Sequence, residues 1–408
     1  MAERKIYIIG GGPAGMMAAI KAAEVLRESG DERAGDRIVL YDKNDVLGRK
    51  IYLTGRGRCN ITNMRPWSEF STHIHPNQNF LKHAFHAFSN SDVIAFFESL
   101  GVPTVVLQGQ RVFPASLKAA DVARSLENRV HELGIQVRRE SVDIKGFDRM
   151  FGDGIVILAT GGKSYPVTGS TGDGYEMASS VGHTVTSLFP CETALLPYGY
   201  DRNLEGIELK NVSLSLFVDK DKVQVEEGDF SFTNDGIESG IAYKISRRAV
   251  WALMNGQRVE VVLDLKPALS KEKLAARIAR DVVQMKGRPK ASSLLRGLMP
   301  EALIAPFLMA DKRAIEIESL PDALKSWRMK IESFKGYERA VVTAGGVSLK
   351  EVSQKTMASK MKPGLFLAGE VLDLDGDTGG YNLQIAFSTG ALAGSSAAKE
   401  LLTSSQAI

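Results

Sequence analysis

The chain has 408 residues and a formal net charge of only +3, and 44% of its residues are hydrophobic and 24% charged. This length predicts two or three domains, and the composition is typical of a soluble globular protein. The sequence has no run of about 18 apolar residues, no cleavable leader pattern and only two cysteines, Cys59 and Cys191, so we expect a cytoplasmic protein without a membrane span or a disulfide framework.

The N-terminal pattern predicts a strand, a glycine-rich turn, a helix and a second strand. These elements cover Lys5–Ile9, Gly10–Gly15, Ala14 to about Arg27, and Arg37–Tyr41. In the turn, the first glycine permits a tight bend, the second lets backbone N–H groups approach a phosphate, and the third lets the helix pack on the strand. The helix N-terminus faces such an anion with its partial positive charge. This arrangement predicts a bound dinucleotide; the alternative is a glycine-rich turn without a ligand.

Asp42, at the end of the second strand, can accept hydrogen bonds from a ribose diol. It lies further from Gly15 than is usual, and the polar loop Glu28–Asp36 can absorb the difference. The residues that we assign to the nucleotide in this region are Gly10, Gly12, Pro13, Ala14, Gly15, Asp42 and Lys43.

Two helices and a buried strand follow. Helical periodicity favours Asp92–Leu100 and Leu117–Leu133, and the second of these is followed by a glycine stop. The apolar run Ile155–Ala159 is typical of a strand buried on both faces. Gly161 and Gly162, just after it, form a second signature typical of FAD domains. Because only one dinucleotide fingerprint occurs, NADH or NADPH would have to bind transiently over the flavin.

The predicted secondary structure changes beyond Pro190. Alternating segments at Val212–Val218 and Val259–Leu265 predict antiparallel strands. Residues from about Ser270 to Lys330 are expected to be mostly helical. The α/β texture then resumes with a strand, Gly364–Ala368, and a closing helix from Gln384 to Leu402.

The segment Lys266–Arg339 is basic, with 16 Lys and Arg against 9 Asp and Glu, whereas the rest of the chain carries a balance of −4. Such asymmetry can attract a polyanion. A solvated helical surface would give the same count.

The acidic run after the last strand admits three interpretations. Asp373, Asp375 and Asp377 match the first ligand positions of a calcium loop, but positions six and twelve are Thr378 and Gln384, so we predict no calcium site. A solvated loop is the plain alternative for these three carboxylates. Glu370, at the strand end, is expected to hold the ribityl chain of a flavin.

The glycine pair after this run would open the closing helix against the pyrimidine side of the flavin, where negative charge develops on reduction. The residues that we assign to the cofactor in this region are Gly369, Glu370, Gly380, Tyr381, Asn382 and Leu383.

Four histidines, His73, His75, His83 and His86, cluster in the sequence. No carboxylate or cysteine joins them at ligand spacing, so we predict a structural role and no metal.

Four separated segments, Gly48–Asn63, Gly161–Tyr175, Thr343–Val347 and Gly364–Gly390, closely resemble the motifs of one bacterial family. It is the family of NAD(P)/FAD-dependent oxidoreductases called BaiN-like or aminoacetone-oxidase-like. The resemblance spans the whole chain and implies an FAD-binding domain of the glutathione-reductase type, a β-barrel-like insert and a small helical domain. One departure is Phe232–Ile241, which lacks a histidine and a proline that members often carry, and this puts a catalytic role for that loop in doubt.

We therefore predict an α/β fold with three parts. These are a discontinuous Rossmann-like FAD-binding domain, 1–189 and 342–408, a β-rich inserted domain, 190–268 with 331–341, and a helical domain, 269–330.

The loop Gly55–Asn63 is the best candidate for substrate contact. Arg56 and Arg58 supply charge, Asn60 an amide, and Cys59 a thiol whose pKa the flanking arginines could lower, making it a proton donor or nucleophile. Alternatively, Cys59 only packs and the arginines neutralise the FAD pyrophosphate. The preceding residues that we assign to the cofactor are Arg49, Lys50 and Thr54.

The first functional hypothesis is an FAD-dependent oxidoreductase that passes hydride to an unsaturated acceptor. Members of the family it resembles have been linked to dihydrouridine formation in large-subunit ribosomal RNA, which would have Cys59 protonate the second carbon of uracil. The runner-up is a small-molecule flavin oxidase or enoyl-type reductase, which should barely respond to charge reversal at Lys286, Arg288 and Lys290. A third possibility is an RNA-binding module that keeps FAD for structure. The oligomeric state stays open.

Overall fold

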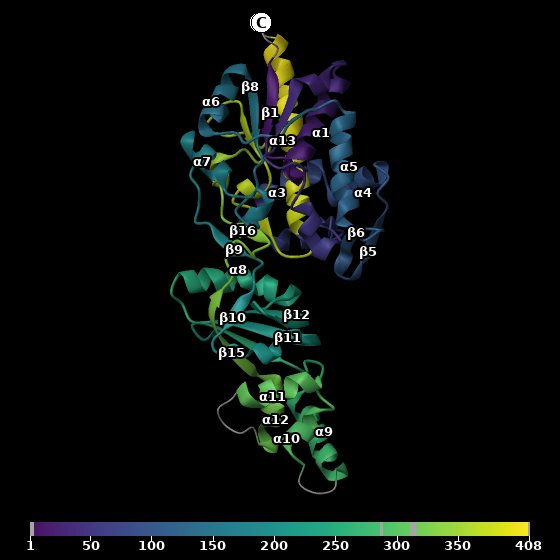
Figure 1. Ribbon diagram of the computed structural model, residues 1–408, viewed down its shortest axis with the longest axis vertical. Coiled ribbons are helices and arrows are strands. Elements are labelled where there is room, and N and C mark those ends of the chain that lie inside the picture. Colours follow the sequence, from purple (N-terminus) through teal and green to yellow (C-terminus); the bar gives the residue numbers. More distant parts are fainter. Residues whose placement is uncertain (1–3, 286–288, 311–315, 407–408) are drawn as a thin grey trace. The chain divides into compact units, whose positions relative to one another are not determined.

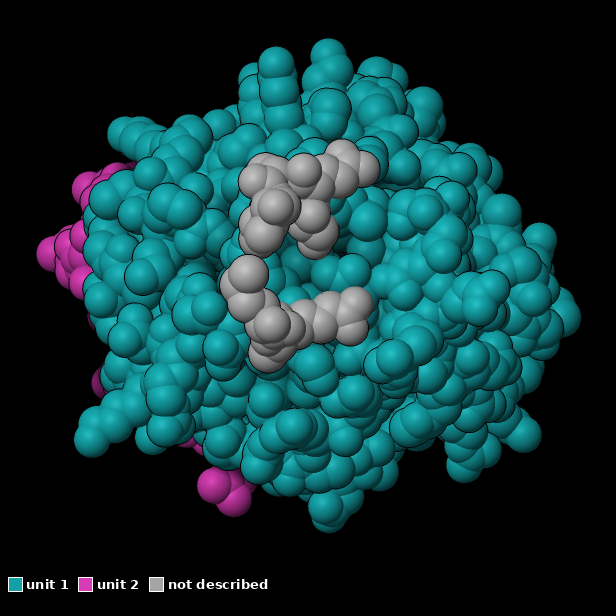
Figure 2. All heavy atoms as spheres, turned by 90° about the horizontal axis from the view of Figure 1, so that it is seen from above, with its two compact units in different colours: residues 1–189, 342–408 teal, residues 190–341 magenta. Residues whose placement is uncertain are grey.

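The computed structural model describes residues 4–285, 289–310 and 316–406. The chain forms two compact units, the first made of residues 1–189 and 342–408 and the second of residues 190–341 (Figure 2). The chain therefore leaves the first unit once and returns to it, and the second unit is an insertion in sequence.

The first unit contains most of the short strands and the longest helices. Its strands are β1 (Lys5–Ile9), β2 (Ile38–Tyr41), β3 (Thr62–Asn63), β4 (Ile74–His75), β5 (Thr104–Leu107), β6 (Arg111–Pro114), β7 (Gln136–Arg138), β8 (Gly154–Leu158), β16 (Val342–Ala344), β17 (Leu365–Leu367) and β18 (Asp375–Gly376), and β9 (Phe189–Cys191) leads out of it. Its helices are α1 (Pro13–Glu28), α2 (Trp67–Phe70), α3 (Gln78–Ala87), α4 (Asn90–Ser99), α5 (Ala119–Glu132), α6 (Ile144–Asp153), α7 (Asp173–Ser180) and α13 (Tyr381–Gln406).

A parallel sheet with strand order β17-β8-β1-β2-β7 forms the centre of this unit. Ile6 of β1 is in register with Ile38 of β2 and Ile155 of β8. Every residue of β8 is buried, as its continuous apolar run predicted. The fold is thus the predicted Rossmann-type α/β fold.

Helices α1 and α13 pack closely together (Figure 1). A Cβ atom on Gly390 would lie 2.3 Å from the carbonyl oxygen of Ala14, and one on Gly394 would lie 2.1 Å from that of Ala18. Only residues without a side chain permit this approach of two helix backbones. The first and last helices of the chain are therefore held against each other by small residues.

The second unit is built around a closed barrel with strand order β10-β13-β12-β11-β14-β15. Its strands are β10 (Leu195–Pro197), β11 (Glu208–Val218), β12 (Asp221–Thr233), β13 (Gly236–Ile237), β14 (Val259–Asp264) and β15 (Trp327–Phe334). Its helices are α8 (Gly240–Met254), α9 (Lys271–Gln284), α10 (Ala291–Leu295), α11 (Glu301–Ala310) and α12 (Leu320–Lys325).

Strand β15 corrects one expectation. The range 269–330 was predicted to be helical, but β15 begins at Trp327 and pairs with β14. From Trp327 to Ile331 buried and exposed residues alternate, which is the period of a strand and not of a helix. The helical part therefore ends at Lys325.

None of the helices in the described ranges combines the length and the apolar character needed to cross a membrane.

Candidate functional site

Three segments that are far apart in sequence meet at the carboxyl ends of β1, β8 and β17. A Cβ atom on Gly10, after β1, would lie 2.4 Å from the carbonyl oxygen of Ala159, which follows β8. One on Gly369, after β17, would lie 2.7 Å from the Cβ of Ala14. Ligands of open parallel sheets bind at this edge. The structure therefore brings the predicted glycine-rich motifs of both chain ends together.

The turn before α1 has the form of an anion cradle. A Cβ atom on Gly15 would lie 1.8 Å from the carbonyl oxygen of Gly10, so the third glycine is required for packing. Gly12, the N-cap of α1, faces open space: nothing lies within 4 Å of the place where its Cβ would be, and no side chain caps the helix. With Pro13 at the first helical position, the free backbone N–H groups that follow fit a pyrophosphate.

Asp42 braces this turn. Its Oδ2 accepts a hydrogen bond from the backbone N of Gly11 at 2.7 Å, and its Oδ1 accepts one from the backbone N of Asn44 at 2.8 Å. A ribose hydroxyl would therefore share the carboxylate with these donors. Arg49 lies beside the same group, its Nη1 donating to Asn44 Oδ1 at 3.3 Å.

The Lys43 side chain binds two residues near the start of α7. Its Nζ donates to Thr171 Oγ1 and to Asp173 Oδ2, both at 2.6 Å. Burial alone would raise the pKa of Asp173, but the hydrogen bonds from Lys43 and Thr171 outweigh it and lower that pKa. Lys43 therefore ties the first residue of α7 to the end of β2.

Glu370 lies at the centre of a second group of predicted cofactor residues. Its Oε2 pairs with Lys50 Nζ at 3.2 Å, and its Oε1 accepts a hydrogen bond from the backbone N of Thr343 at 2.8 Å. A Cβ atom on Gly162 would lie 2.7 Å from the same Oε1. The structure thus joins Lys50, Gly162 and Glu370, which are separated by up to 320 positions in the sequence.

Thr343 is a site residue that the sequence reasoning did not single out. Its Oγ1 accepts hydrogen bonds from the backbone N of Lys163 at 2.8 Å and of Ser164 at 3.0 Å. It therefore fixes the loop that follows Gly162. The available signal was its place at the start of the Thr343–Val347 motif.

The N-terminus of α13 is a tight glycine turn. Gly379 and Gly380 have φ values of +135° and +97°, which favour glycine. A Cβ atom on Gly380 would lie 2.4 Å from the carbonyl oxygen of Thr62 and 2.9 Å from Asn60 Oδ1. Asn382 closes the turn on itself, since its Oδ1 accepts from Gly376 N and its Nδ2 donates to Gly376 O, both at 2.8 Å.

The side chain of Tyr381 points into the protein. Its ring is buried against the rings of Phe70 and His73, with centroids 4.8 and 4.4 Å away. A cofactor at this helix end would therefore meet the backbone of Tyr381 and not its ring. Leu383, in the same first turn, is half-buried.

Two buried polar atoms near these turns have no hydrogen-bond partner among the described residues: Asn60 Oδ1 and Thr160 Oγ1. An unpaired buried acceptor costs about 1–3 kcal/mol. A ligand that carries hydrogen-bond donors would remove that cost, so these atoms, the open Gly12 and the glycine turn at α13 all fit a flavin dinucleotide.

The loop that contains Asn60 is irregular and largely exposed. A 3₁₀ segment, Ile51–Gly57, is interrupted at Thr54–Arg56, where Gly55 and Arg56 have positive φ values. Thr54 Oγ1 donates to Ile51 O at 2.6 Å. Arg58 Nε donates to Gly55 O at 3.2 Å, and the Arg58 guanidinium lies 5.5 Å from the centre of the Phe113 ring.

Cys59 does not have the properties expected of a proton donor. Its side chain is fully buried, and burial raises the pKa of the thiol to about 12. The expectation that Arg56 and Arg58 lower this pKa is wrong, because both arginines are exposed and desolvation dominates at the thiol. Cys59 is a packing residue in this structure.

A carboxylate joins two of the clustered histidines, contrary to the sequence interpretation. His73 Nδ1 lies 2.8 Å from Asp377 Oδ2, and His75 Nε2 lies 3.0 Å from Asp377 Oδ1. The pairing of β4 with β18 places Asp375 opposite His75 and brings the two segments together. Asp375 is also buried, so the interpretation of this acidic run as a solvated loop is wrong at both positions.

Among the residues that the structure describes, no group of three or more His, Cys, Asp or Glu side chains could hold a metal ion.

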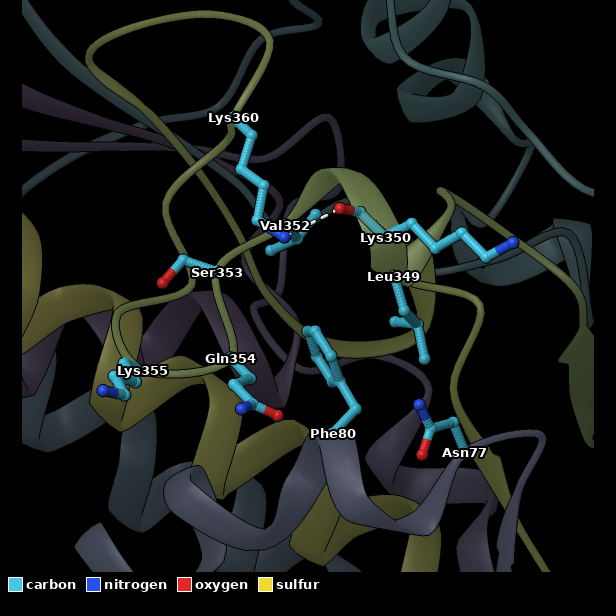
Figure 3. Close-up of a pocket in the computed structure, with 9 residues that line it drawn as sticks. All are labelled: Asn77, Phe80, Leu349, Lys350, Val352, Ser353, Gln354, Lys355 and Lys360. Atoms are coloured by element: carbon cyan, nitrogen blue, oxygen red, sulfur yellow. Dashed lines mark hydrogen bonds between the residues drawn. The ribbon is translucent and has the colours of Figure 1, made fainter.

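A separate pocket of about 410 Å³ opens between α3 and residues 349–360 (Figure 3). Phe80, Leu349 and Val352 form its apolar part, while Lys350 and Lys355 extend away from its centre. Lys360 Nζ donates to the carbonyl oxygen of Lys350 at 2.8 Å. The nine residues that line it include no carboxylate, thiol or imidazole.

In the second unit, the loop that departs from the family pattern is an ion-paired turn. Asp235 pairs with Lys335 at 3.0 Å and with Arg339 at 2.7 Å. Burial acts to raise the pKa of Asp235, but the hydrogen bond from Lys335 and the charge of Arg339 outweigh it and lower that pKa. A short hydrogen bond joins Tyr243 to Glu238.

Acidic partners compensate several cations of the basic segment 266–339. Lys271 pairs with Asp322, Lys325 with Asp264, and Arg328 with Glu260, at 2.6 to 2.7 Å. These pairs weaken the field that the charge count suggests. Residues 286–288 and 311–315, including Lys286 and Arg288, lie outside the described ranges.

The sequence matches the family model described as HI0933-like protein Rossmann domain over residues 4–396. A 3-dehydro-bile acid delta(4,6)-reductase of Clostridium scindens is 30% identical, over 97% of this chain and 99% of its own. Ribosomal RNA dihydrouridine synthases of Haemophilus influenzae and Escherichia coli are each 27% identical, over 94% of this chain and 95% of their own.

Proposed function

The chain belongs to the HI0933-like Rossmann-domain family and is an FAD-dependent oxidoreductase, and from this premise we propose that it reduces a carbon–carbon double bond of its acceptor with electrons from NADH or NADPH. The relatives support this reaction class. A delta(4,6)-reductase and the dihydrouridine synthases are both named for adding hydrogen to a double bond.

The convergence at the sheet edge is the observation that carries the proposal. The open backbone at Gly12 and the Lys50–Glu370 pair lie at the carboxyl ends of the parallel strands, and the glycine turn at Gly380 belongs to the same unit. The residues that would hold FAD are Gly10, Gly12, Pro13, Ala14, Gly15, Asp42, Lys50, Gly161, Gly162, Gly369, Glu370, Gly380, Tyr381, Asn382 and Leu383. Bound FAD would supply a hydride donor that NAD(P)H reloads.

The residues of this chain bind and orient the ligand. The first N–H groups of α1 favour a pyrophosphate, and those of α13 favour an anionic group at the other end of the cofactor. Lys50 is held by Glu370, which fixes its ammonium at the edge of the site. Asn60 Oδ1 is free to accept a hydrogen bond from a donor on the ligand.

For the acceptor, we propose a uridine of large-subunit ribosomal RNA. The dihydrouridine synthases match almost the whole chain, and the segment 266–339 has the basic excess that a polyanion requires. In this version, the second unit supplies phosphate contacts and the sheet unit supplies the chemistry.

A small unsaturated ketone is the second candidate, and two observations favour it. The bile acid reductase has the higher identity to this chain, and the ion pairs at Lys271, Lys325 and Arg328 leave less positive charge for RNA. A conjugated ketone would need no polyanion surface.

The test begins with the FAD-loaded full-length protein and NADPH or NADH without oxygen. We expect the flavin absorbance to bleach, and then to return when the acceptor is added. Protein-free ribosomal RNA and a conjugated steroid enone are added in parallel, with dihydrouridine and saturated product measured by mass spectrometry. If the flavin colour returns only with RNA, the uridine acceptor is supported. If it returns only with the enone, the small unsaturated ketone is supported. A flavin that never bleaches contradicts the proposed reaction and favours a structural flavin.

A further inference from the structure

Saturation of a double bond requires a proton as well as a hydride. The sequence suggested Cys59 as the proton donor, but its thiol is buried with a pKa of about 12. The proposed reaction therefore needs a proton source other than this thiol. The imidazole–carboxylate–imidazole cluster of His73, Asp377 and His75 has the chemistry that this step needs.

The cluster is well fixed. Both oxygens of Asp377 are occupied, one by each imidazole, and the backbone N of Asp377 donates to the carbonyl oxygen of His73 at 2.9 Å. The strand pair β4–β18 joins the two segments directly beside these contacts. The side chains of His73, His75 and Asp377 keep 22%, 28% and 20% of their surface exposed, so a proton can be replaced from solvent.

The hydrogen bonds determine where each imidazole carries its protons. An ionised carboxylate only accepts, so His73 must carry a hydrogen on Nδ1 and His75 one on Nε2. This leaves Nε2 of His73 and Nδ1 of His75 for other partners. Burial would raise the pKa of Asp377, but the hydrogen bonds from His73 and His75 outweigh it and lower that pKa to about 2, so the carboxylate is ionised at any working pH.

The cluster adjoins the glycine turn of the proposed flavin site. The His73 ring stacks on the ring of Tyr381, the first residue of α13, with the planes 27° apart. A Cβ atom on Gly379 would lie 3.0 Å from the Tyr381 ring. The His73 imidazole and the glycine turn therefore both contact the Tyr381 ring.

Other charged groups surround this point. Arg65 and Glu69, from the segment that precedes His73, act on the Tyr381 hydroxyl and pair with each other at 2.7 Å. Burial, the largest effect, raises the pKa of Tyr381 to about 12, so its hydroxyl stays neutral. The buried Asp375 lies opposite His75 on β18.

We propose that His73, oriented by Asp377, holds at Nε2 the proton that the acceptor receives, and that His75 keeps Asp377 in place. This rests on the proposed function. In the balanced step, the two electrons come from NAD(P)H as a hydride on one carbon, the imidazolium N–H bond breaks, and its proton bonds to the other carbon. The double bond becomes a single bond, and His73 regains its proton from solvent.

Rapid mixing of the FAD-loaded enzyme measures separately the reduction of the flavin by NAD(P)H and the reduction of the acceptor by the flavin. We expect His73→Gln and Asp377→Asn to slow the reduction of the acceptor by about 10²-fold, the usual contribution of general acid catalysis. The reduction of the flavin by NAD(P)H takes up no proton from His73 and should change far less. His83→Gln is the matched control, because His83 is an exposed histidine of α3 outside the cluster.

A solvent isotope effect distinguishes a proton donor from a structural residue. Acceptor reduction by the wild type should be slower in heavy water, because this step breaks the N–H bond of His73. The His73→Gln variant should lose this isotope effect. In the full-length protein labelled with ¹⁵N-histidine, the imidazole signal that His73→Gln removes should show the Nδ1–H form, and Asp377→Asn should abolish that form at His73.

The outcomes separate the two proposals. A wild-type enzyme that reduces neither RNA nor enone overturns the proposed function, whatever the histidine variants do. A wild type that reduces an acceptor, with His73→Gln retaining both its rate and its solvent isotope effect, overturns only the proton role. Absence of the Nδ1–H form at His73 in the wild type also overturns that role.

Discussion

At the scale of single residues, Asn60 and Asn63 are two asparagines of one loop with opposite hydrogen bonding. Asn60 Oδ1 is buried without a partner, whereas Asn63 Nδ2 donates to Gly379 O at 3.0 Å and to Gly109 O at 3.1 Å. One amide is therefore available for a ligand, and the other already belongs to the fold.

We expect Asn60→Ala to weaken FAD binding by about tenfold, because one ligand hydrogen bond is worth roughly 1.4 kcal/mol. The same change should leave the apoprotein as stable as before or slightly more stable, since it removes an unpaired buried acceptor. Asn63→Ala is the control and should destabilise the apoprotein. FAD titration and urea unfolding measure the two effects, and an Asn60→Ala protein with unaltered FAD affinity would contradict the assignment.

Cys59→Ala should retain acceptor reduction within a few-fold of the wild type, because the thiol is buried and its pKa is about 12. The cost should be structural, roughly 1 kcal/mol of unfolding free energy from the lost packing. Steady-state rates and thermal unfolding check both. Loss of more than about 10²-fold in rate without unfolding would restore Cys59 as a catalytic residue.

Asp377 should contribute to acid stability. Its pKa is lowered from 3.8 to about 2 in the folded chain, so its contribution, about 2 kcal/mol, is present above pH 4 and is lost as the pH falls towards 2. Urea unfolding between pH 5 and 2 should show that Asp377→Asn loses less unfolding free energy on acidification than the wild type, by this amount. If the unfolding free energies of the two proteins fall equally with pH, the pairing of Asp377 with the two histidines is contradicted.

At the scale of elements, the helices and strands predicted for the sheet unit begin and end close to the predicted residues. The reason is that each has strong periodicity or a glycine stop. The apolar run at Ile155–Ala159, for example, became β8, Gly154–Leu158. The two-residue strands β4 and β18 gave no such signal. Their pairing, and with it the contact between His73 and Asp377, depends on tertiary structure over about 300 residues.

In the candidate site, too, some features could be predicted from the sequence and others depend on the folded chain. The spacing of Gly10, Gly12 and Gly15 was sufficient to predict the tight turn between β1 and α1, because backbone geometry alone determines its form. The protonation of Cys59 could not be deduced from its neighbours in sequence, since the desolvation that sets its pKa is a property of the folded chain.

The packing of α1 on α13 gives a test at this scale. A Cβ atom on Gly394 would lie 2.1 Å from Ala18 O, so we expect Gly394→Ala to force the helices apart and to lower the free energy of unfolding by about 1–3 kcal/mol. Gly152→Ala, in α6, meets nothing within 4 Å and should be neutral or slightly stabilising. Chemical denaturation compares them, and equal stability of the two variants would refute the close packing.

At the scale of the whole molecule, the chain begins and ends in the same unit. Helix α1 and helix α13 lie together, and the turns that precede each of them are the glycine-rich motifs recognised in the sequence. We propose that both turns serve one bound FAD. In the sequence, the two turns are separated by residues 190–341, which form a unit of their own.

The most direct test is a titration of the full-length apoprotein with FAD, followed by the quenching of flavin fluorescence and by the flavin absorbance bands. We expect saturable binding of one FAD per chain, and its loss in Gly380→Val, in which a side chain would meet Thr62 O at 2.4 Å. Absence of saturable binding in the folded wild type would contradict the account, as would undiminished binding in Gly380→Val.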